Sequence, residues 1–572
     1  MSDLLARLRE ARANRPLDEL PCPERIRRLP LLDPTPQEYP ALIEKWTDRF
    51  HIDRPDRRPL RSVQALALEH AEWAASSPDP IGMLANIAVG GGKTLITFLL
   101  PKIFNAKRPV LLTKAKLKKN HHDQLYEWCN YYDFAPTRYV VDPYLRVVSY
   151  SELSQPSASA LLRELNPDLI VADECHSLRH ASAARTKRFL RYMNSPSGRN
   201  CRFVGMSGTL TNSSIGDYAH LSHLALRQYS PLPIHEHDVK LWGSVLNVRG
   251  EPDSTAWHAV EAAGIDTEGR KQQPTRENYA EHFSSVAGVV CSTGMSTDVP
   301  LTIEALHWEV PDAVRRALAD LSEDWVLPDG TEVVDALAYH SALSQLSIGF
   351  YYVWDWPNDE PDEEWMEARR GWWKACREYL KYYSREGCDS PFLVEEFLRN
   401  SNVPAPGLRA AWARWEEQKH KDPPPTRAVW IDKTPVYQAV GTVLSKPEPT
   451  LLWFRSRAVG ELIKSMGIPT YWQDEPTPGQ TCALSARIHG TGKNYQAWAR
   501  NIDLEPTTNA AEVEQQMGRT HRQGQEKPVY FGINMSTWAH QVVWATLLNK
   551  ARYAQGITKQ PQKILWGTQE GF

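Results

Sequence analysis

The sequence predicts a protein of the α/β class, in which parallel strands alternate with helices. Three observations support this prediction. Residues 82–100, GMLANIAVGGGKTLITFLL, have the pattern of a buried strand, a three-glycine turn and a helix that stops at Pro101. Residues 168–174, DLIVADE, have the pattern of a second buried strand, which ends in two carboxylates. The length of 572 residues exceeds one hydrophobic core and indicates three or four structural units of roughly 150 residues each.

The composition is that of an ordinary globular protein, with 42% hydrophobic and 24% charged residues. No apolar run approaches the ~20 residues of a membrane span, and the charged N-terminal segment differs from a secretion signal, so we expect a cytoplasmic protein without a membrane partner. Eight cysteines without a C-x-x-C pair indicate neither a zinc site nor a disulfide framework. Because the formal net charge is -3, any nucleic-acid binding must come from a local basic patch.

The glycine loop predicts a phosphate-binding site. Glycines Gly90, Gly91 and Gly92 would allow the backbone to approach phosphate oxygens with its N–H groups exposed. Lys93 would then reach the β- and γ-phosphates of ATP, and the hydroxyl of Thr94 would hold Mg²⁺. The match is relaxed, because the strict pattern G-x-x-x-x-G-K-[ST] has glycine where this chain has Ile87.

The two carboxylates at the end of the second strand complete a nucleoside triphosphatase pattern. Adjacent carboxylates repel each other, and burying them without a cation costs several kcal/mol. They would be tolerated as solvated charges at a surface strand end. At a nucleotide site, Asp173 would instead support Mg²⁺, and Glu174 would orient or deprotonate the attacking water. A glycine loop after one strand and an acidic pair after another favour the second interpretation.

Further segments follow in order along the chain: RPLRSVQALAL (58–68), VLLTKAKLKKNHHDQLYEW (110–128), VVSYSELS (147–154), DECH (173–176), GMSGTLTN (205–212), LLWFRSRAVGELI (451–463), HGTGKNYQ (489–496) and EQQMGRTHRQGQ (514–525). Together they resemble the superfamily-two helicases, most closely the Swi/Snf-like DNA translocases. The last segment is the most specific, since this family ends its second lobe with Q-x-x-x-R-x-x-R-x-G-Q. The resemblance covers roughly residues 60–310 and 430–540.

The resemblance implies two RecA-like lobes, each a doubly wound parallel sheet, with a helical insertion between them. We expect a Pro/Arg-rich N-terminal arm at 1–57, the first lobe at 58–310, a Trp-rich helical insertion at 311–430, and the second lobe with a C-terminal tail at 431–572. Two differences from the family pattern bear on which subfamily the chain resembles. Ile87 and Ala88 replace an acidic pair before the glycines, and Tyr495 replaces a usual leucine. The compact size suggests a phage or mobile-element member.

The resemblance also assigns roles to individual residues. It implies that Gln64 contacts the adenine edge and that five residues couple the ATP site to nucleic acid: His176, Ser207, Thr209, Gly492 and Asn494. It implies that Gln515, Arg519 and Arg522 act in catalysis with Glu174. Independently of the family, a guanidinium delivered in the transition state of phosphoryl transfer accelerates it by ~10³–10⁵. Two arginines three residues apart on a predicted helix would project from one face; an exposed basic helix end is the alternative.

A basic segment at 101–122 holds seven Lys or Arg and no acidic residue. We expect Lys114, Lys116 and Lys118 to contact nucleic acid, with a solvated helix face as the alternative. The histidine pairs in this chain (His121 with His122, His235 with His237) have no cysteine or carboxylate partners at ligand spacing, and we expect them at the surface.

The segment between the predicted lobes contains eight tryptophans from Trp354 to Trp430. Such residues can stack on exposed bases, at ~1–3 kcal/mol each. However, Trp412 and Trp415 have the i, i+3 spacing of a packed helix face, which favours a core role.

These features predict an ATPase that uses ATP and Mg²⁺, and the resemblance implies that it depends on nucleic acid and moves along DNA in replication, recombination or repair. Duplex DNA is favoured over single strands or RNA, and protein partners are not predicted. A strand-separating or RNA helicase is a second interpretation. An ATP-gated clamp or scaffold, which binds nucleic acid without moving, is a third.

Overall fold

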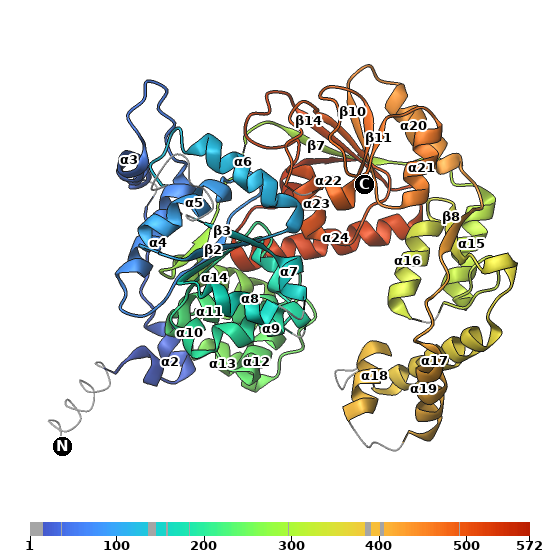
Figure 1. Cartoon of the computed structure of the whole chain (residues 1–572), viewed down its shortest axis with the longest axis horizontal. Helices are drawn as coiled ribbons and strands as arrows, with labels where there is room; N and C mark the ends of the chain where they lie inside the picture. The colour runs from blue at the N-terminus through green and yellow to red at the C-terminus, as the bar shows by residue number, and fades with distance from the viewer. Residues whose placement is uncertain are drawn as a thin grey trace.

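The computed structural model describes residues 15–572, except 36, 135–144, 156–157, 182, 296, 334, 384–390, 401–404 and 491. It confirms the predicted α/β class. The described chain contains a six-stranded and a seven-stranded parallel sheet, which lie in separate lobes, and a two-stranded antiparallel ribbon (Figure 1). Within this described part, no helix combines the length and the apolar character that crossing a bilayer requires.

The first lobe is built on the sheet β3-β2-β4-β5-β1-β6. Its strands are β1 (Met83–Asn86), β2 (Pro109–Thr113), β3 (Arg146–Ser149), β4 (Leu169–Asp173), β5 (Arg202–Ser207) and β6 (Val289–Cys291). They are apolar along most of their length because helices cover both faces of the sheet. All strands are parallel, so the glycine loop after β1, the carboxylates after β4 and Ser207 at the end of β5 meet at one edge.

Successive residues of these strands feed two hydrophobic cores. Leu111 and Val171 pack with helices α3 (Tyr39–Phe50), α4 (Ser62–Ser76), α5 (Lys93–Ile103) and α6 (Lys118–Trp128). Val110 and Ile170 pack on the other face. That face is covered by α7 (Tyr150–Ser154), α8 (Ala158–Leu165), α9 (Ala184–Met193), α11 (Ala219–Leu226), α12 (Glu236–Leu246), α13 (Ser254–Glu261) and α14 (Gln272–Ser285), with α10 (Pro196–Arg199) between α9 and β5.

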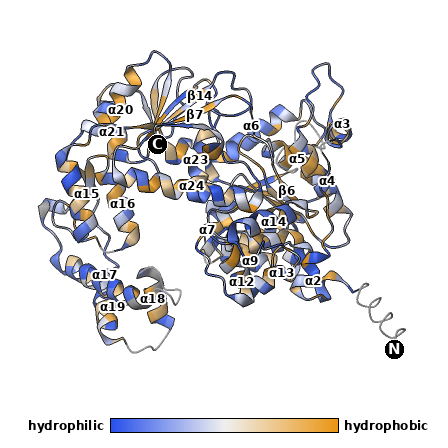
Figure 2. Cartoon of the chain, turned by 180° about the vertical axis from the view of Figure 1, so that it is seen from behind, coloured by the Kyte–Doolittle hydropathy of each residue, from blue (hydrophilic) through white to orange (hydrophobic). Residues whose placement is uncertain are grey.

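The second lobe is built on the sheet β11-β12-β10-β13-β14-β7-β15. Its strands are β7 (Leu301–Leu306), β10 (Thr450–Phe454), β11 (Thr470–Tyr471), β12 (Cys482–Ser485), β13 (Arg500–Asp503), β14 (Val529–Asn534) and β15 (Thr568–Glu570). One face packs on α20 (Thr434–Leu444) and α21 (Arg457–Ser465), the other on α23 (Ala510–Met517) and α24 (Trp538–Thr558). Figure 2 shows hydrophobic residues concentrated in the strands of this lobe.

The boundary between the lobes differs from the expected position at residue 310. Strand β7 lies in the second sheet, between β14 and β15. The insertion therefore interrupts the second lobe after its first strand. The sequence of β7 shows an alternating strand pattern but does not reveal a partner more than 200 residues away, because pairing between distant strands depends on tertiary packing.

The insertion consists of α15 (Asp312–Asp324), α16 (Ala336–Leu346), the ribbon of β8 (Phe350–Trp354) and β9 (Thr426–Trp430), and the helices α17 (Glu363–Tyr383), α18 (Pro391–Asn400) and α19 (Pro406–Gln418). Its tryptophans pack largely on one another. Trp365 lies edge-to-face on Trp354 and Trp415, with ring centroids 5.5 and 5.8 Å apart, and Trp372 is buried in a separate small core. Trp365 and Trp372 therefore have the predicted core role, and Trp412 and Trp415 pack, partly buried, against this small core.

The described segments near the two ends of the chain are more closely integrated than expected. The first 14 residues of the predicted arm lie outside the described residues. The part that follows packs on the first lobe, where Arg25 of α2 (Cys22–Arg27) donates hydrogen bonds to the carbonyls of Gln228 and Leu232 at 2.8 and 2.7 Å. The predicted C-terminal tail contains α24, α25 (Lys563–Trp566) and β15, so it completes the second sheet.

Candidate functional site

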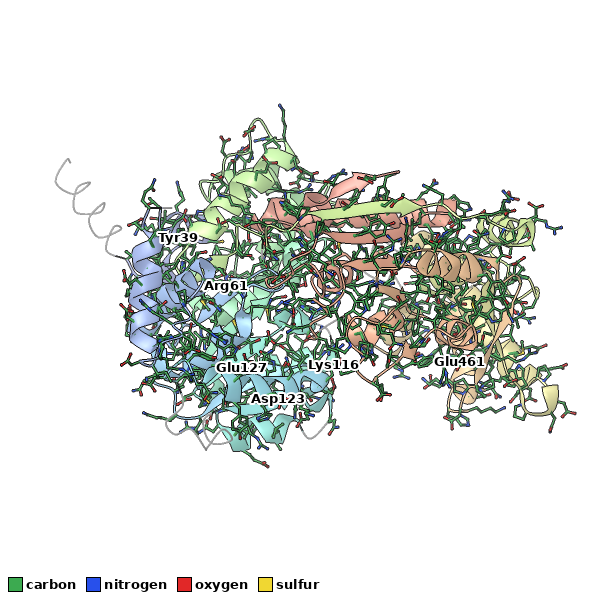
Figure 3. All side chains as sticks on the ribbon, turned by 90° about the horizontal axis from the view of Figure 1, so that it is seen from above. Tyr39, Arg61, Lys116, Asp123, Glu127 and Glu461 are labelled. Carbon is green, nitrogen blue, oxygen red and sulfur yellow. The ribbon has the colours of Figure 1, made fainter. Side chains whose placement is uncertain are left out.

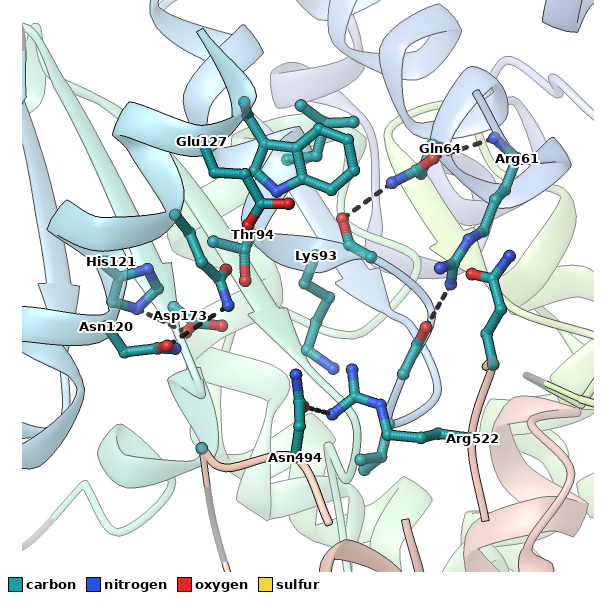
Figure 4. A pocket seen from close by; sticks show the side chains of 18 of the residues that line it. Arg61, Gln64, Lys93, Thr94, Asn120, His121, Glu127, Asp173, Asn494 and Arg522 are labelled. Atoms are coloured by element: carbon teal, nitrogen blue, oxygen red, sulfur yellow. Dashed lines mark hydrogen bonds and ion pairs between the residues drawn. The ribbon is translucent and has the colours of Figure 1, made fainter. Parts of the chain in front are cut away.

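A cleft of about 670 Å³ lies between the two lobes, and most of the predicted ATP-site residues line it (Figure 4). From the first lobe come the glycine loop, Lys93, Thr94, Asp173 and Glu174. From the second lobe come Gly492, Asn494, Arg519, Arg522 and Gln523. The two groups of residues are more than 300 positions apart in sequence and are brought together by the packing of the lobes.

The glycine loop follows β1 and leads directly into α5. Gly90 and Gly92 have φ angles of 87° and 84°, which only glycine adopts without strain. A Cβ atom at Gly92 would also overlap the side chain of Gln64. The loop therefore presents bare backbone and the N-terminus of the 11-residue helix α5 to the cleft, an arrangement that favours anion binding.

Gln64 supports this loop through both ends of its side-chain amide. Its Oε1 accepts a hydrogen bond from the Arg61 backbone N–H at 2.9 Å, and its Nε2 donates to the Gly92 carbonyl at 3.1 Å. The Arg61 guanidinium donates to the Gly90 carbonyl. Gln64 also lines the cleft, so its expected contact with an adenine edge stays a prediction.

Lys93 turns back to the loop and donates to the carbonyl of Ile87 at 2.9 Å. In Figure 4, Lys93, Asn494 and Arg522 point into the same part of the cleft, from both lobes. Three polar groups of this kind suit a polyanion.

Asp173 has a partner that the sequence did not indicate. His121 Nε2 lies 3.2 Å from Asp173 Oδ2 and 3.1 Å from Thr113 Oγ1, and only 3% of His121 is exposed. We expected this histidine at the surface, which is wrong. The periodicity contained a signal, since Leu117, just before α6, and His121 and Leu125 within it are four residues apart and all three are buried.

Glu174 is held in a strained conformation, with a φ angle of 58°. Burial raises the pKa of this carboxyl, but the hydrogen bond from His176 and the positive charge of Lys93 outweigh it and hold the pKa well below its usual range. The distance from His176 Nδ1 to Glu174 Oε2 is 3.2 Å. Glu174 is therefore an ionised acceptor at the edge of the cleft.

Three of the five predicted coupling residues form a chain behind Glu174. His176 Nδ1 lies 3.0 Å from Ser207 Oγ, which accepts a hydrogen bond from the Thr209 backbone N–H at 3.0 Å. Burial lowers the pKa of His176. The chain of hydrogen bonds joins the ends of β4 and β5, so a displacement of Glu174 would also displace residues 207–209.

The two arginines of the second lobe face the cleft, but they are not on a helix as we expected. Helix α23 ends at Met517, and both arginines follow in a turn. The helix ends where Gly518 packs against the glycine loop: a Cβ atom there would lie 2.6 Å from Val89 Cγ1. The predicted helical placement of the arginines was wrong, because Gly518 caps the end of α23 and also makes this contact between the lobes.

Hydrogen bonds to the second lobe orient both guanidinium groups. Arg519 donates to the carbonyls of Gln515 and Lys493 at 2.9 and 2.8 Å, and Arg522 donates to Asn494 Oδ1. Burial, followed by the neighbouring charge of Arg522, lowers the pKa of Arg519 to about 10. Burial, followed by the charge of Arg61, lowers that of Arg522 to about 10. Both groups remain cations at neutral pH.

Two contacts join the lobes beside the arginines. Gln515 Nε2 lies 3.5 Å from Glu174 Oε2. Gly492, with a φ angle of 80°, is so close to Leu117 that a Cβ atom there would overlap the leucine side chain. A glycine is therefore required at position 492, both for its backbone angle and for the close contact between the lobes.

The three lysines expected to contact nucleic acid have different surroundings. Lys116 lies at the boundary between the lobes (Figure 3) and donates to the Ile488 carbonyl, at 2.7 Å, in α22 (Ala486–His489). Burial and then the charge of Lys114 lower the pKa of Lys116 to about 8. Lys118 forms an ion pair of 2.5 Å with Glu152. Lys114 lines a pocket of about 440 Å³ together with Arg179, His180 and Arg185.

The chemistry of the cleft suits a nucleoside triphosphate with a divalent cation. The Thr94 hydroxyl and the Asp173 carboxylate line the cleft and offer the oxygen ligands that Mg²⁺ prefers. Backbone N–H groups, Lys93 and two arginines offer donors to phosphate oxygens. No protein-family model matches this chain, and a search of curated proteins finds no similar sequence.

Proposed function

We propose that the protein is an ATP-driven motor on nucleic acid, with two RecA-like lobes, and that it translocates along duplex DNA in the manner of the Swi/Snf-like family. One observation carries the proposal. A glycine loop, a lysine, an acidic pair and two arginines from distant parts of the chain line a single cleft between the lobes.

In this proposal, the first lobe binds ATP. The loop N–H groups and Lys93 hold the phosphates, and Lys93 exchanges its bond to the Ile87 carbonyl for phosphate oxygens. Thr94 and Asp173 would hold Mg²⁺, which would neutralise charge on the transferred phosphoryl group. His121 orients the carboxylate of Asp173 through the 3.2 Å contact.

Glu174 is the proposed general base. Its low pKa keeps it ionised and able to accept a hydrogen bond from the attacking water, while His176 fixes its orientation. Gln515 supports the same carboxylate from the second lobe. Arg519 and Arg522 stabilise the charge that develops on the γ-phosphate, so hydrolysis requires both lobes to be in contact.

The proposed nucleic-acid contact lies next to this machinery. The pocket formed by Lys114, Arg179, His180 and Arg185 also includes His176, the residue that holds Glu174. Its cations suit a phosphate backbone. A phosphate bound in this pocket would lie beside His176, which contacts the proposed general base Glu174. This arrangement supports coupling between nucleic-acid binding and ATP hydrolysis.

The test measures ATP hydrolysis without nucleic acid and with single-stranded DNA, duplex DNA or RNA, beside a triplex-displacement assay. We expect duplex DNA to stimulate hydrolysis most and the triplex strand to be displaced. The Glu174→Gln variant is the control and should bind ATP without turnover. Strand separation without triplex displacement would favour a helicase. Nucleic-acid binding without hydrolysis would favour a clamp, and no ATP binding would exclude the whole proposal.

A further inference from the structure

Residues 558–563, here called the C-terminal link, contact both lobes. They join α24 to α25. The first half of α24 packs in the second lobe, through Trp544 and Leu547. Its last turns pack in the first lobe, where Tyr553 and Ile557 belong to the core. The link therefore begins in one lobe and returns to the other.

The link is hydrogen-bonded to two segments of the candidate site, one in each lobe. Gln560, which is fully buried, donates through Nε2 to the Gly208 carbonyl at 2.8 Å. Gly208 lies between Ser207 and Thr209, in the chain that leads to Glu174. At the other end, the Lys563 backbone N–H donates to Glu514 Oε2 at 2.7 Å.

Glu514 lies on α23, immediately before Gln515, which contacts Glu174 across the cleft. The contacts consequently form a closed ring. It runs from Glu174 through His176 and Ser207 to Gly208, through the C-terminal link to Glu514, and back through Gln515 to Glu174.

The ring contains atoms whose hydrogen-bonding capacity is unused. Within the described part of the chain, Gln560 Oε1 and Thr209 Oγ1 are buried and have no partner. A buried polar atom without a partner is unfavourable, so a small shift that satisfied either atom would be favourable. Both atoms flank the Gly208 contact, which a displacement of Glu174 would shift.

We infer that Gln560 is a positioning residue that transmits the state of the ATP site to the arginine-bearing turn after α23. The inference rests on the proposed ATPase function. When nucleotide binding or hydrolysis moves the residues around Glu174, Gly208 moves as well and displaces Gln560 through their hydrogen bond. The C-terminal link then shifts Glu514 and α23, which places Arg519 and Arg522 at the γ-phosphate. The lobes would close as one unit because the link belongs to both.

The experiment compares Gln560→Leu, which keeps the side-chain volume but removes the donor, with Glu514→Ala and the double variant. Gln272→Ala is the matched control, since it removes a side-chain bond of the same type, to the Ser244 and Gly250 carbonyls inside the first lobe. Nucleic-acid-stimulated kcat, KM for ATP and the thermal shift with a non-hydrolysable ATP analogue are measured for each.

We expect Gln560→Leu to lower kcat by roughly tenfold, in the range of typical coupling between sites, with ATP affinity unchanged. The double variant should be no slower than the slower single variant, because both changes cut the same connection. Gln272→Ala should retain wild-type kcat. A wild-type kcat in Gln560→Leu, or losses that multiply in the double variant, would overturn the inference while leaving the ATPase proposal intact. Absence of hydrolysis in the wild type would instead refute the ATPase proposal and, with it, this inference.

Discussion

Replacing Glu514 with glutamine should make the stability of the protein less dependent on pH. Glu514 is 1% exposed, and burial raises the pKa of its carboxyl to about 7, although the charge of Lys563 and two backbone N–H groups oppose the shift. In the unfolded chain, the carboxyl has its usual pKa of 4.5. Between these values the unfolded chain binds fewer protons than the folded protein, so stability falls as pH rises from 4.5 towards 7.

The magnitude follows from the difference between the two pKa values. A difference of about 2.5 units (7 minus 4.5), at 1.36 kcal/mol per unit, corresponds to a cost of about 3 kcal/mol above pH 7. Glu514→Gln removes the ionisation but keeps an oxygen that can accept the Lys563 N–H. The variant should therefore be stabilised relative to the wild type by less than about 1 kcal/mol at pH 5 and by about 3 kcal/mol at pH 8.

Urea unfolding followed by tryptophan fluorescence measures this difference at both pH values. Glu251→Gln, a change of the same type at an exposed position, controls for the loss of a formal charge. A stability difference between Glu514→Gln and the wild type that is equal at pH 5 and pH 8 would refute the raised pKa.

Arg519→Ala should lower kcat of the proposed ATPase by about 10³ or more with little change in KM, because the guanidinium would act on charge that develops in the transition state; a normal turnover rate would exclude this role. Lys114→Glu should weaken nucleic-acid binding and flatten its dependence on salt, whereas Lys116→Glu should chiefly impair contact between the lobes, since Lys116 donates a hydrogen bond to the second lobe. Binding isotherms measured over a salt series distinguish the two variants, and identical effects would contradict this assignment. Gly492→Ala should hinder closure of the lobes because its Cβ would overlap Leu117, and small-angle scattering should show a more open molecule that Leu117→Ala partly restores. An unchanged scattering profile would show that this contact is not needed for closure.

Local sequence was sufficient to predict the parts of the fold and the candidate site that depend on neighbouring residues. The apolar runs at β1 and β4 predicted buried parallel strands, and the α/β class was confirmed. Because parallel strands share one carboxyl edge, the glycine loop and the Asp173–Glu174 pair could be expected to meet, and they line one cleft. The chemistry of these groups can be read from residue type and order alone. ATP hydrolysis and movement on DNA stay predictions.

Tertiary structure alone decided the features that depend on distant segments. The turn of Gln64 towards Gly92, the burial of His121 against Asp173 and the packing of Gly518 on Val89 all result from contacts between separate elements. The place of β7 in the second sheet likewise depends on pairing with β14. The C-terminal link is the extreme case: nothing in the local sequence of Gln560 indicates that its amide meets Gly208, 352 residues away, because such a contact is selected by the packing of whole lobes and not by the conformational preference of the chain around it.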